Sequence, residues 1–288
     1  MKRNVYVLVL IFSILLILSS CKEKSRIISE KIIEQEGYSN LVETKKITYL
    51  SDGLEVVGYL VKPNKTEEQL PVIIFNRGGN REFYKISDEK AANLLEYFAS
   101  RNYVVLASQY RGNDGGEGKE EFGGSDLNDV LNLIDIAKDL PFANSEQIFM
   151  LGASRGGMMT YMASRNSTDI KAAAVIGGPS DVIQGYNETP DMRKILINLI
   201  GGTPENLEDE YIERSAFYWA DEINVPLLIL HGSDDSRVNQ SQAQKIANEL
   251  DKYDKEYKLI IYPGDDHGLT NNAKKAFEEI FDWFESHK

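Results

Sequence analysis

The chain has 288 residues, enough to bury one large core, and its 42% hydrophobic and 27% charged residues are typical of a globular protein. We therefore expect one main domain. The formal net charge of -13 at pH 7 argues against nucleic acid as a partner, and against docking on anionic lipid by charge.

The N-terminus has the form of a secretory signal. Lys2 and Arg3 precede an apolar run at residues 5–18, and the only cysteine, Cys21, follows two serines. The run is short for a helix that spans a bilayer, so a permanent transmembrane anchor is the weaker interpretation. The stretch LSSC, which ends at Cys21, resembles the lipobox of bacterial lipoproteins, in which cleavage falls before the cysteine and the cysteine is acylated.

These features predict three parts of the chain. Residues 1–20 are a signal peptide, residues 21–39 are a polar tether held to a membrane by lipid on Cys21, and residues 40–288 form the folded domain. The resemblance implies a place in the bacterial cell envelope, outside the cytoplasm, since several acyl chains hold a protein firmly. The alternative is a signal peptide that happens to end near a lone cysteine.

Beyond the tether, apolar runs alternate with amphipathic stretches, which predicts strands and helices around a mostly parallel, open α/β sheet. The first two strand candidates alternate apolar and polar residues, as antiparallel edge strands do, and the later ones suit strands covered on both faces. The eight candidates are residues 45–50, 54–61, 71–79, 103–112, 147–154, 170–178, 226–235 and 257–268. Helices are expected at residues 88–101, 126–140, 155–164, 240–253 and 271–287.

Residues 181–222 interrupt this alternation, because they contain no clear strand and two or three helical stretches. An insertion above the carboxyl ends of parallel strands commonly serves as a lid or a pocket wall. Its aromatic residues Tyr186, Tyr218 and Trp219 are therefore candidates for binding a substrate. Packing within the insertion is an equally good interpretation of these side chains.

The stretch GASRGG at residues 152–157 holds a candidate nucleophile. Gly152, Ser154 and Gly156 form the pattern G-x-S-x-G between a strand candidate and a helix candidate. A sharp turn there lifts the serine hydroxyl above the sheet edge, and small neighbours let other main chain approach. The backbone N–H of Arg155 then lies at a helix N-terminus, where it can donate to a developing oxyanion. The alternative is a turn serine without chemistry.

A serine hydroxyl needs a base, and the chain has only three histidines. His287 is the penultimate residue, and His231 closes an apolar strand candidate, where a structural role is expected. His267 follows the last strand candidate in a loop, YPGDDHG, from which it can reach a serine on a neighbouring strand, so elimination and position select it. An acid that orients the imidazole is expected in HGSDDSRV, where Asp234 and Asp235 compete on nearly equal terms.

Five stretches together resemble the catalytic domain of the prolyl oligopeptidase family, serine peptidases of the α/β-hydrolase fold. They are YRGNDGGEG, GGSDLNDVLNLIDIAKDL, GASRGGMM, ADEINVPLLILHGSDDSRV and YPGDDHG, and the resemblance covers residues 70–286. It implies an α/β-hydrolase fold with an eight-stranded, mostly parallel sheet flanked by helices and a small helical lid. It also selects Asp235, because the family's acid is the third residue after the glycine of H-G and stands three before a valine, here Val238.

The resemblance also bears on the second oxyanion donor, which in the family comes from the turn after an earlier strand. A tyrosine or histidine usually precedes a glycine pair there, but this chain has Arg77 before Gly78 and Gly79. A side-chain hydroxyl is therefore not expected to donate. A backbone N–H of Gly78 or Gly79 is the expected partner of the Arg155 N–H.

Four arginines, Arg77, Arg81, Arg111 and Arg155, are expected at the carboxyl edge of the sheet. Positive charge there would suit a substrate that carries a carboxylate or another anion, with Arg77 and Arg155 as the candidates for binding it. The alternative is that these arginines pair with nearby acids such as Asp126. For Arg111 a structural role is favoured.

The sequence predicts a serine hydrolase that works through an acyl-enzyme on a short peptide or another small molecule, and the resemblance implies a serine peptidase. A carboxylesterase or deacylase of the same fold is the main alternative, and a non-catalytic binding lipoprotein is the remote one. No cluster of histidine, cysteine and carboxylates has metal-ligand spacing, and no phosphate-binding glycine loop is present, so neither metal nor cofactor is expected. The sequence does not indicate an oligomeric state.

Overall fold

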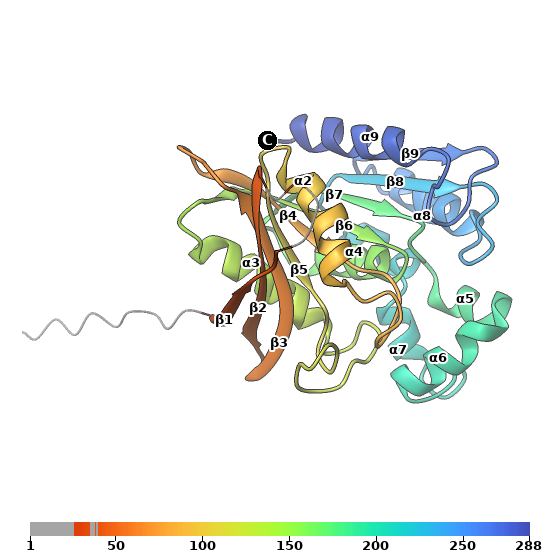
Figure 1. Ribbon diagram of the computed structural model, residues 1–288. Coiled ribbons are helices and arrows are strands. Elements are labelled where there is room, and N and C mark those ends of the chain that lie inside the picture. The colour runs from red at the N-terminus through yellow and green to blue at the C-terminus, as the bar shows by residue number, and fades with distance from the viewer. Residues whose placement is uncertain (1–25, 35–37, 39) are drawn as a thin grey trace, which may run out of the picture.

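One sheet organises the computed structural model, which describes residues 26–34, 38 and 40–288 (Figure 1). Its strands are β1 (Ile27–Ile32), β2 (Val42–Ser51), β3 (Leu54–Pro63), β4 (Leu70–Asn76), β5 (Val104–Ser108), β6 (Ala143–Ala153), β7 (Ile170–Ile176), β8 (Leu227–Gly232) and β9 (Tyr257–Tyr262). Their order across the sheet is β1-β2-β3-β5-β4-β6-β7-β8-β9. The pairs β1–β2, β2–β3 and β3–β5 are antiparallel. The remaining pairs, β5–β4, β4–β6, β6–β7, β7–β8 and β8–β9, are parallel.

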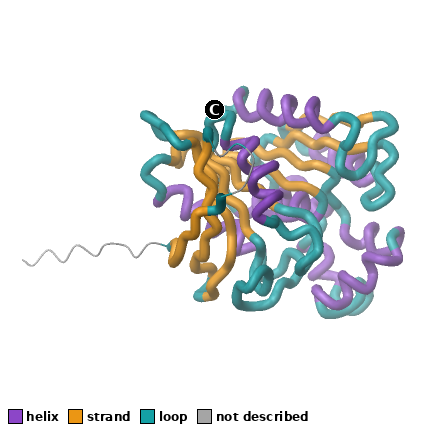
Figure 2. Tube along the Cα trace, in the orientation of Figure 1, coloured by secondary structure: helices purple, strands orange, loops and turns teal. Residues whose placement is uncertain are grey.

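Helices cover both faces of this sheet (Figure 2). They are α1 (Asp88–Lys90), η1 (Ala91–Leu95), α2 (Glu96–Ala99), α3 (Leu127–Asp139), α4 (Arg155–Asn166), α5 (Val182–Glu188), α6 (Pro190–Ile200), α7 (Glu208–Glu213), η2 (Ala216–Glu222), α8 (Ser241–Lys252) and α9 (Ala273–Glu285). Here η1 is a π-helical turn that joins α1 to α2, and η2 is a 3₁₀ helix. Helices α2 and α9 share one hydrophobic core with the sheet, and α3, α4 and α8 share the other.

The continuous apolar runs follow from this double cover. In β4, Val72 and Ile74 belong to the core shared with α3 and α4, whereas Ile73 and Phe75 belong to the core shared with α2 and α9. Successive side chains of a strand point to opposite faces, so a strand covered twice is apolar at every position. The eight expected strands correspond to β2 to β9, and the five expected helices are also found.

The predicted tether is different in part. Residues 27–32 form β1, which pairs antiparallel with β2 at the edge of the sheet, so the described sheet has nine strands rather than eight. Most side chains of β1 are exposed, because an edge strand needs only one hydrogen-bonded partner and buries little. That lack of burial left no hydrophobic pattern to detect. The predicted signal peptide and the predicted lipidation site, Cys21, lie outside the described residues.

The order of the strands defines where a ligand would meet the sheet. After β4 the chain adds β5 on one side, and then β6 on the other side of β4. Ligands of open α/β sheets bind at such a switch point, beyond the carboxyl ends of the strands. The segment 181–222 leaves the sheet after β7 and holds α5, α6, α7 and η2. Helices α5, α6 and α7 lie at the lower right of Figure 1.

Arg111, which follows β5, forms a buried ion pair with Asp129 of α3. Its Nη2 lies 2.8 Å from Asp129 Oδ1, and its backbone N–H donates to Asp129 Oδ2 at 2.7 Å. The Ser51 hydroxyl of β2 donates to the same carboxylate at 2.6 Å. Arg111 therefore has the structural role that the sequence favoured, since it joins the sheet to α3.

We predict that Asp129→Ala lowers the free energy of unfolding by about 3–5 kcal/mol, because it leaves the Arg111 guanidinium buried without its main partner. Asp135 of the same helix is the matched control. It forms an exposed ion pair with Arg26 at 3.3 Å, so Asp135→Ala should cost about 1 kcal/mol or less. Urea unfolding followed by circular dichroism measures both changes. Equal losses would contradict the role of the Arg111 pair.

Candidate active site

Ser154 stands at a strained turn between β6 and α4. Its backbone has φ 56° and ψ -126°, which is unusual for a residue with a side chain, and its N–H donates to Ile176 O at 2.8 Å. The glycines on either side are required by close main-chain approach. A Cβ at Gly156 would lie 1.9 Å from Asn76 O, and one at Gly152 would lie 2.0 Å from Gly156 O. This is the geometry that presents a serine above a sheet edge.

His267 and Asp235 contact each other at the same edge. His267 Nδ1 lies 2.7 Å from Asp235 Oδ2, so Nδ1–H donates to the carboxylate and Nε2 is left as the basic nitrogen. A Cβ at Gly177 would lie 3.1 Å from His267 Nδ1 and 3.3 Å from Asp235 Oδ2. The pair therefore lies directly over the end of β7. Gly177 follows Ile176, whose carbonyl accepts the Ser154 N–H, so the His267–Asp235 pair and the backbone of Ser154 lie at the same strand end.

The structure distinguishes the two candidate acids. The Asp235 side chain is fully buried and contacts His267, whereas Asp234 is exposed and accepts a hydrogen bond from the Ser233 hydroxyl at 2.9 Å. The Asp234 N–H donates to Asp265 O at 2.9 Å, which ties the acid loop to the histidine loop. Only Asp235 is placed to orient the imidazole.

Asp235 is held as a carboxylate. Burial opposes its charge, but hydrogen bonds from His231 and His267 hold the pKa of Asp235 well below its usual range. Its Oδ1 accepts the backbone N–H groups of Arg237 and Val238 at 2.8 and 2.9 Å. The contact with His231 was not predicted, because the spacing between a strand residue and a loop residue does not show that the loop turns back.

The loop that carries His267 is held by the two acids before it. Asp265 is buried, and its Oδ1 accepts the N–H of Asp266 at 3.0 Å. Asp266 Oδ1 accepts the N–H groups of Gly268 and Thr270, each at 3.0 Å. These side chains replace regular secondary structure in the loop, so the base is presented by a fixed backbone.

Gly78 and Gly79 follow β4 and lie beside the nucleophile. A Cβ at Gly78 would lie 3.1 Å from Ser154 Cβ and 3.8 Å from its Oγ. Gly79 has φ +73°, and a Cβ there would lie 2.2 Å from Phe83 O. Gly79 is therefore required by close approach, whereas a side chain at Gly78 would be tightly crowded against Ser154, which the loop faces. Arg155, the other predicted donor, is the first residue of α4.

The structure does not place Arg77 in a position to bind substrate. Its side chain is only 1% exposed and is surrounded by backbone carbonyls. Its guanidinium nitrogens donate to Gln109 O at 2.9 Å, Arg81 O at 2.9 Å, Gly78 O at 3.0 Å and Phe83 O at 3.4 Å. Arg77 therefore shapes the glycine loop from beneath, which is a structural function rather than the expected recognition of an anion.

Arg155 is likewise internal, with 2% of its side chain exposed. It forms ion pairs with Asp126 and with Glu120, the latter at 3.0 Å, and its guanidinium lies 4.6 Å from the ring centre of Tyr110. Its Nη1 also donates to Gly79 O at 3.3 Å. The alternative of pairing with acids is thus what the structure shows for this side chain.

The aromatic residues of the insertion are placed differently from one another. Trp219 is 3% exposed, belongs to the core and donates from Nε1 to Ile212 O at 3.0 Å, so it does not line a pocket. Tyr186 is half-buried and packs edge-on against Tyr211, with ring centres 5.9 Å apart. Tyr218 is exposed. Packing therefore accounts for Trp219 and largely for Tyr186.

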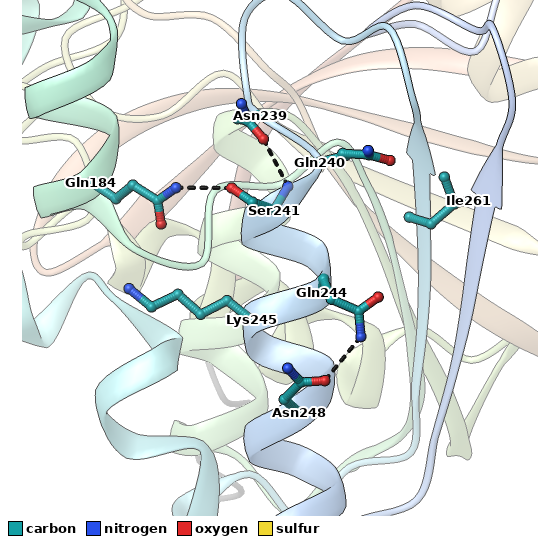
Figure 3. Close-up of a pocket in the computed structure, with 8 residues that line it drawn as sticks. All are labelled: Gln184, Asn239, Gln240, Ser241, Gln244, Lys245, Asn248 and Ile261. Carbon is teal, nitrogen blue, oxygen red and sulfur yellow. Dashed lines mark hydrogen bonds between the residues drawn. The ribbon is translucent and has the colours of Figure 1, made fainter.

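A pocket of about 540 Å³ lies between the insertion and α8 (Figure 3). Gln184 of α5 faces Ser241 at the start of α8, and its Nε2 donates to the Ser241 hydroxyl at 3.0 Å. The lining is mostly amide side chains, and it contains neither Ser154 nor His267. This pocket is therefore not lined by the predicted catalytic residues.

Side chains that the sequence did not single out surround the glycine loop. Phe83 and Tyr84 are exposed, and their rings meet edge-on with centres 4.6 Å apart. A Cβ at Gly79 would lie 2.8 Å from Tyr84 Cβ, and the guanidinium of exposed Arg237 lies 5.7 Å from the Tyr84 ring centre. The loops after β4 and β8 thus meet beside Ser154. The stretch NREFYK after the glycine pair was the available signal.

Within the part of the chain that the structure describes, no group of three histidine, cysteine or carboxylate side chains is arranged to hold a metal ion. No helix among those residues is long and apolar enough to cross a membrane.

Comparisons with known proteins concern the family and the fold of the chain. A family model described as the prolyl oligopeptidase family matches residues 90–288. The uncharacterized peptidase YtmA of Bacillus subtilis is 32% identical over 260 residues, which cover 88% of this chain and 99% of that protein. Dipeptidyl aminopeptidase BIII of Pseudoxanthomonas mexicana is 25% identical over 81% of this chain but only 36% of its own length.

The solved structure of uncomplexed acylaminoacyl peptidase from Pyrococcus horikoshii has a TM-score of 0.74 and 25% identity, over 86% of this chain and 42% of that one. This chain therefore spans nearly all of YtmA and less than half of the other two proteins. The mostly parallel sheet flanked by helices is the α/β-hydrolase fold, as expected. The chain belongs to the prolyl oligopeptidase family, a family of serine hydrolases whose matching members are named peptidases.

Proposed function

We propose that this protein is a serine peptidase that cleaves short peptides through an acyl-enzyme, with Ser154, His267 and Asp235 as its triad. The observation that carries the proposal is the 2.7 Å contact between His267 Nδ1 and the buried Asp235 carboxylate. It stands over the strand end that holds the strained Ser154 turn. An oriented base and a half-buried serine at the same strand end are the minimum that acyl transfer requires.

The mechanism follows from the positions of these groups. Ser154 Oγ attacks the carbonyl carbon while His267 Nε2 takes its proton, and the backbone N–H groups of Arg155 and of Gly78 or Gly79 stabilise the oxyanion. His267 then protonates the leaving amine, the C–N bond breaks and the acyl-enzyme forms. Water gives a proton to His267 and attacks the acyl carbon; the bond from that carbon to Ser154 Oγ then breaks, His267 returns the proton to Oγ, and the acid leaves.

We predict that a fluorophosphonate probe labels the wild-type protein and that Ser154→Ala abolishes labelling, because the probe forms a bond only with an activated serine. Asp235→Asn should lower kcat by about 10⁴-fold, since the imidazole loses its orientation and the stabilisation of its charge. Turnover of peptidyl amides, compared with short acyl esters, measures kcat and identifies the substrate class.

Asp234→Asn is the matched control for this prediction, because it makes the same chemical change at the next residue, which is exposed, and it should leave kcat within about twofold. Equal losses at both positions would reject Asp235 as the acid. An unlabelled wild type would favour a non-catalytic binding protein. Turnover of esters without amides would favour the carboxylesterase or deacylase alternative.

We further propose that Arg81 and Arg237, rather than Arg77 or Arg155, bind an anionic group of the substrate. Both side chains are exposed on the loops that meet beside Ser154, and neither forms an ion pair with the described residues. An unpaired guanidinium can accept a substrate carboxylate without breaking an existing contact.

Arg237→Ala and Arg81→Ala are each predicted to reduce the preference for carboxylate-bearing over neutral substrates by about tenfold, the worth of one charged hydrogen bond. The measurement is the ratio of kcat/KM for two substrates that differ only in that carboxylate. Arg101→Ala is the control, because Arg101 is exposed but pairs with Glu278 on α9. An unchanged ratio in both loop variants would dismiss the role of this charge.

We propose, finally, that the protein is secreted and anchored by lipid on Cys21 in the bacterial cell envelope. Support comes from the basic, apolar and LSSC segments in sequence. Ile27, where β1 begins, follows Cys21 by six residues, a contour of about 20 Å. A lipid at Cys21 would therefore hold the domain close to the membrane surface.

Cys21→Ala is predicted to move the protein from the membrane fraction to the soluble fraction, because acylation requires the thiol. Cell fractionation with immunoblotting measures the distribution, and metabolic labelling with palmitate tests the modification directly. Ser20→Ala keeps the cysteine and serves as the control. A C21A protein that stays with membranes would exclude a lipid anchor at this position.

A further inference from the structure

His231 is a fully buried histidine that the mechanism above does not use. It lies near the end of β8, and none of its surface is exposed. Its Nε2 is 2.8 Å from Val238 O and 3.1 Å from Asp235 Oδ2. Its Nδ1 is buried and has no hydrogen-bond partner among the described residues.

These contacts define the protonation of the ring. Val238 O and the Asp235 carboxylate are both acceptors, so Nε2 carries a hydrogen, which it donates to Val238 O while it lies 3.1 Å from Asp235 Oδ2. A hydrogen on Nδ1 would be buried without an acceptor, which costs about 1–3 kcal/mol. His231 is therefore neutral, with its proton on Nε2. A neutral ring can support the carboxylate without competing for the positive charge that forms on His267.

The carboxylate is thereby held on both oxygens. Its Oδ1 accepts the N–H groups of Arg237 and Val238, and its Oδ2 faces His231 and His267. Val238 contacts both side chains, because its carbonyl oxygen accepts a hydrogen bond from His231 Nε2 and its N–H donates to Asp235 Oδ1. The His231 ring thus locks the short turn from Asp235 to Val238 around the carboxylate.

We propose that His231 is a positioning residue, which orients the Asp235 carboxylate toward His267 and stabilises its charge. This inference rests on the proposed function. The carboxylate can rotate about its χ2 bond, and the two main-chain donors on Oδ1 restrict the direction of Oδ2 less than they do together with the His231 ring packed 3.1 Å from Oδ2. An oriented Oδ2 keeps His267 Nε2 directed at the nucleophile when the imidazolium forms.

The test compares replacements of His231 that keep or lose the Nε2 donor. Glutamine carries its amide nitrogen as far along the side chain as Nε2 of histidine, whereas leucine has no donor and asparagine places its nitrogen where Nδ1 was. We expect His231→Leu and His231→Asn to lower kcat by about 10- to 100-fold with KM changed less than about twofold, as when a residue that orients a catalytic ligand is removed. His231→Gln should recover most of kcat.

Two measurements separate positioning from general support of the fold. In a protein that already carries Asp235→Asn, His231→Leu should lower kcat by less than about twofold further, because the group through which it acts is gone. His287→Leu, a change at a histidine of the C-terminal end, should leave kcat unchanged. Thermal unfolding of every variant shows whether the fold persists.

The outcomes are distinct. A wild type that turns over no amide or ester and takes no fluorophosphonate overturns the proposed function and this inference together. An active wild type with equal kcat in the leucine, asparagine and glutamine variants overturns only the inference. So does a full, independent loss from His231→Leu on the Asp235→Asn background. If the leucine variant does not fold, the comparison of glutamine with asparagine decides the question.

Discussion

The buried charge of Arg155 is the constraint on which the arrangement of this site depends. Arg155 follows Ser154 directly in the sequence, and its guanidinium is buried. Burial of an unpaired charge costs several kcal/mol, so other segments of the chain must supply acidic partners. Asp126, at the start of α3, and Glu120, in the loop before it, are those partners. The ion pairs therefore fix the start of α4, and with it the Ser154 turn, relative to the loop before α3 and the start of that helix.

The same cluster extends to the loop that faces Ser154. Burial would raise the pKa of Glu120, but the Arg155 charge and a hydrogen bond from Asn113 hold the pKa of Glu120 below its ordinary value. As a carboxylate, Glu120 also accepts a hydrogen bond from the backbone N–H of Arg81. Arg77 donates a hydrogen bond to the carbonyl oxygen of Gly78 in the same loop. Two arginines and two acids thus balance in charge, and they set main-chain positions on both sides of the nucleophile.

What the sequence could predict depended on local rules. The glycines around Ser154 predict a sharp turn because its steric requirements involve only neighbouring residues. His267 could be selected because the chain has only three histidines. The choice of Asp235 needed a family resemblance, since the burial that separates it from Asp234 arises from the turn of its loop. The burial of Arg77 and Trp219 was beyond reach for the same reason. The sequence does not show whether a long polar side chain such as Arg77 contacts water or backbone carbonyls from other segments.

Residues enclosed by several segments differ from surface residues in how freely they can be replaced, and this difference bears on where substrate specificity can change. Residues that set the reaction geometry are enclosed by several segments, so a change in one of them disturbs all the others. Tyr84 and Arg237, by contrast, extend from loops whose backbones are held by other side chains, and they meet at the surface. Their identity can vary at little structural cost. Discrimination between substrates is therefore more readily tuned at this rim than at the arginines beneath the nucleophile.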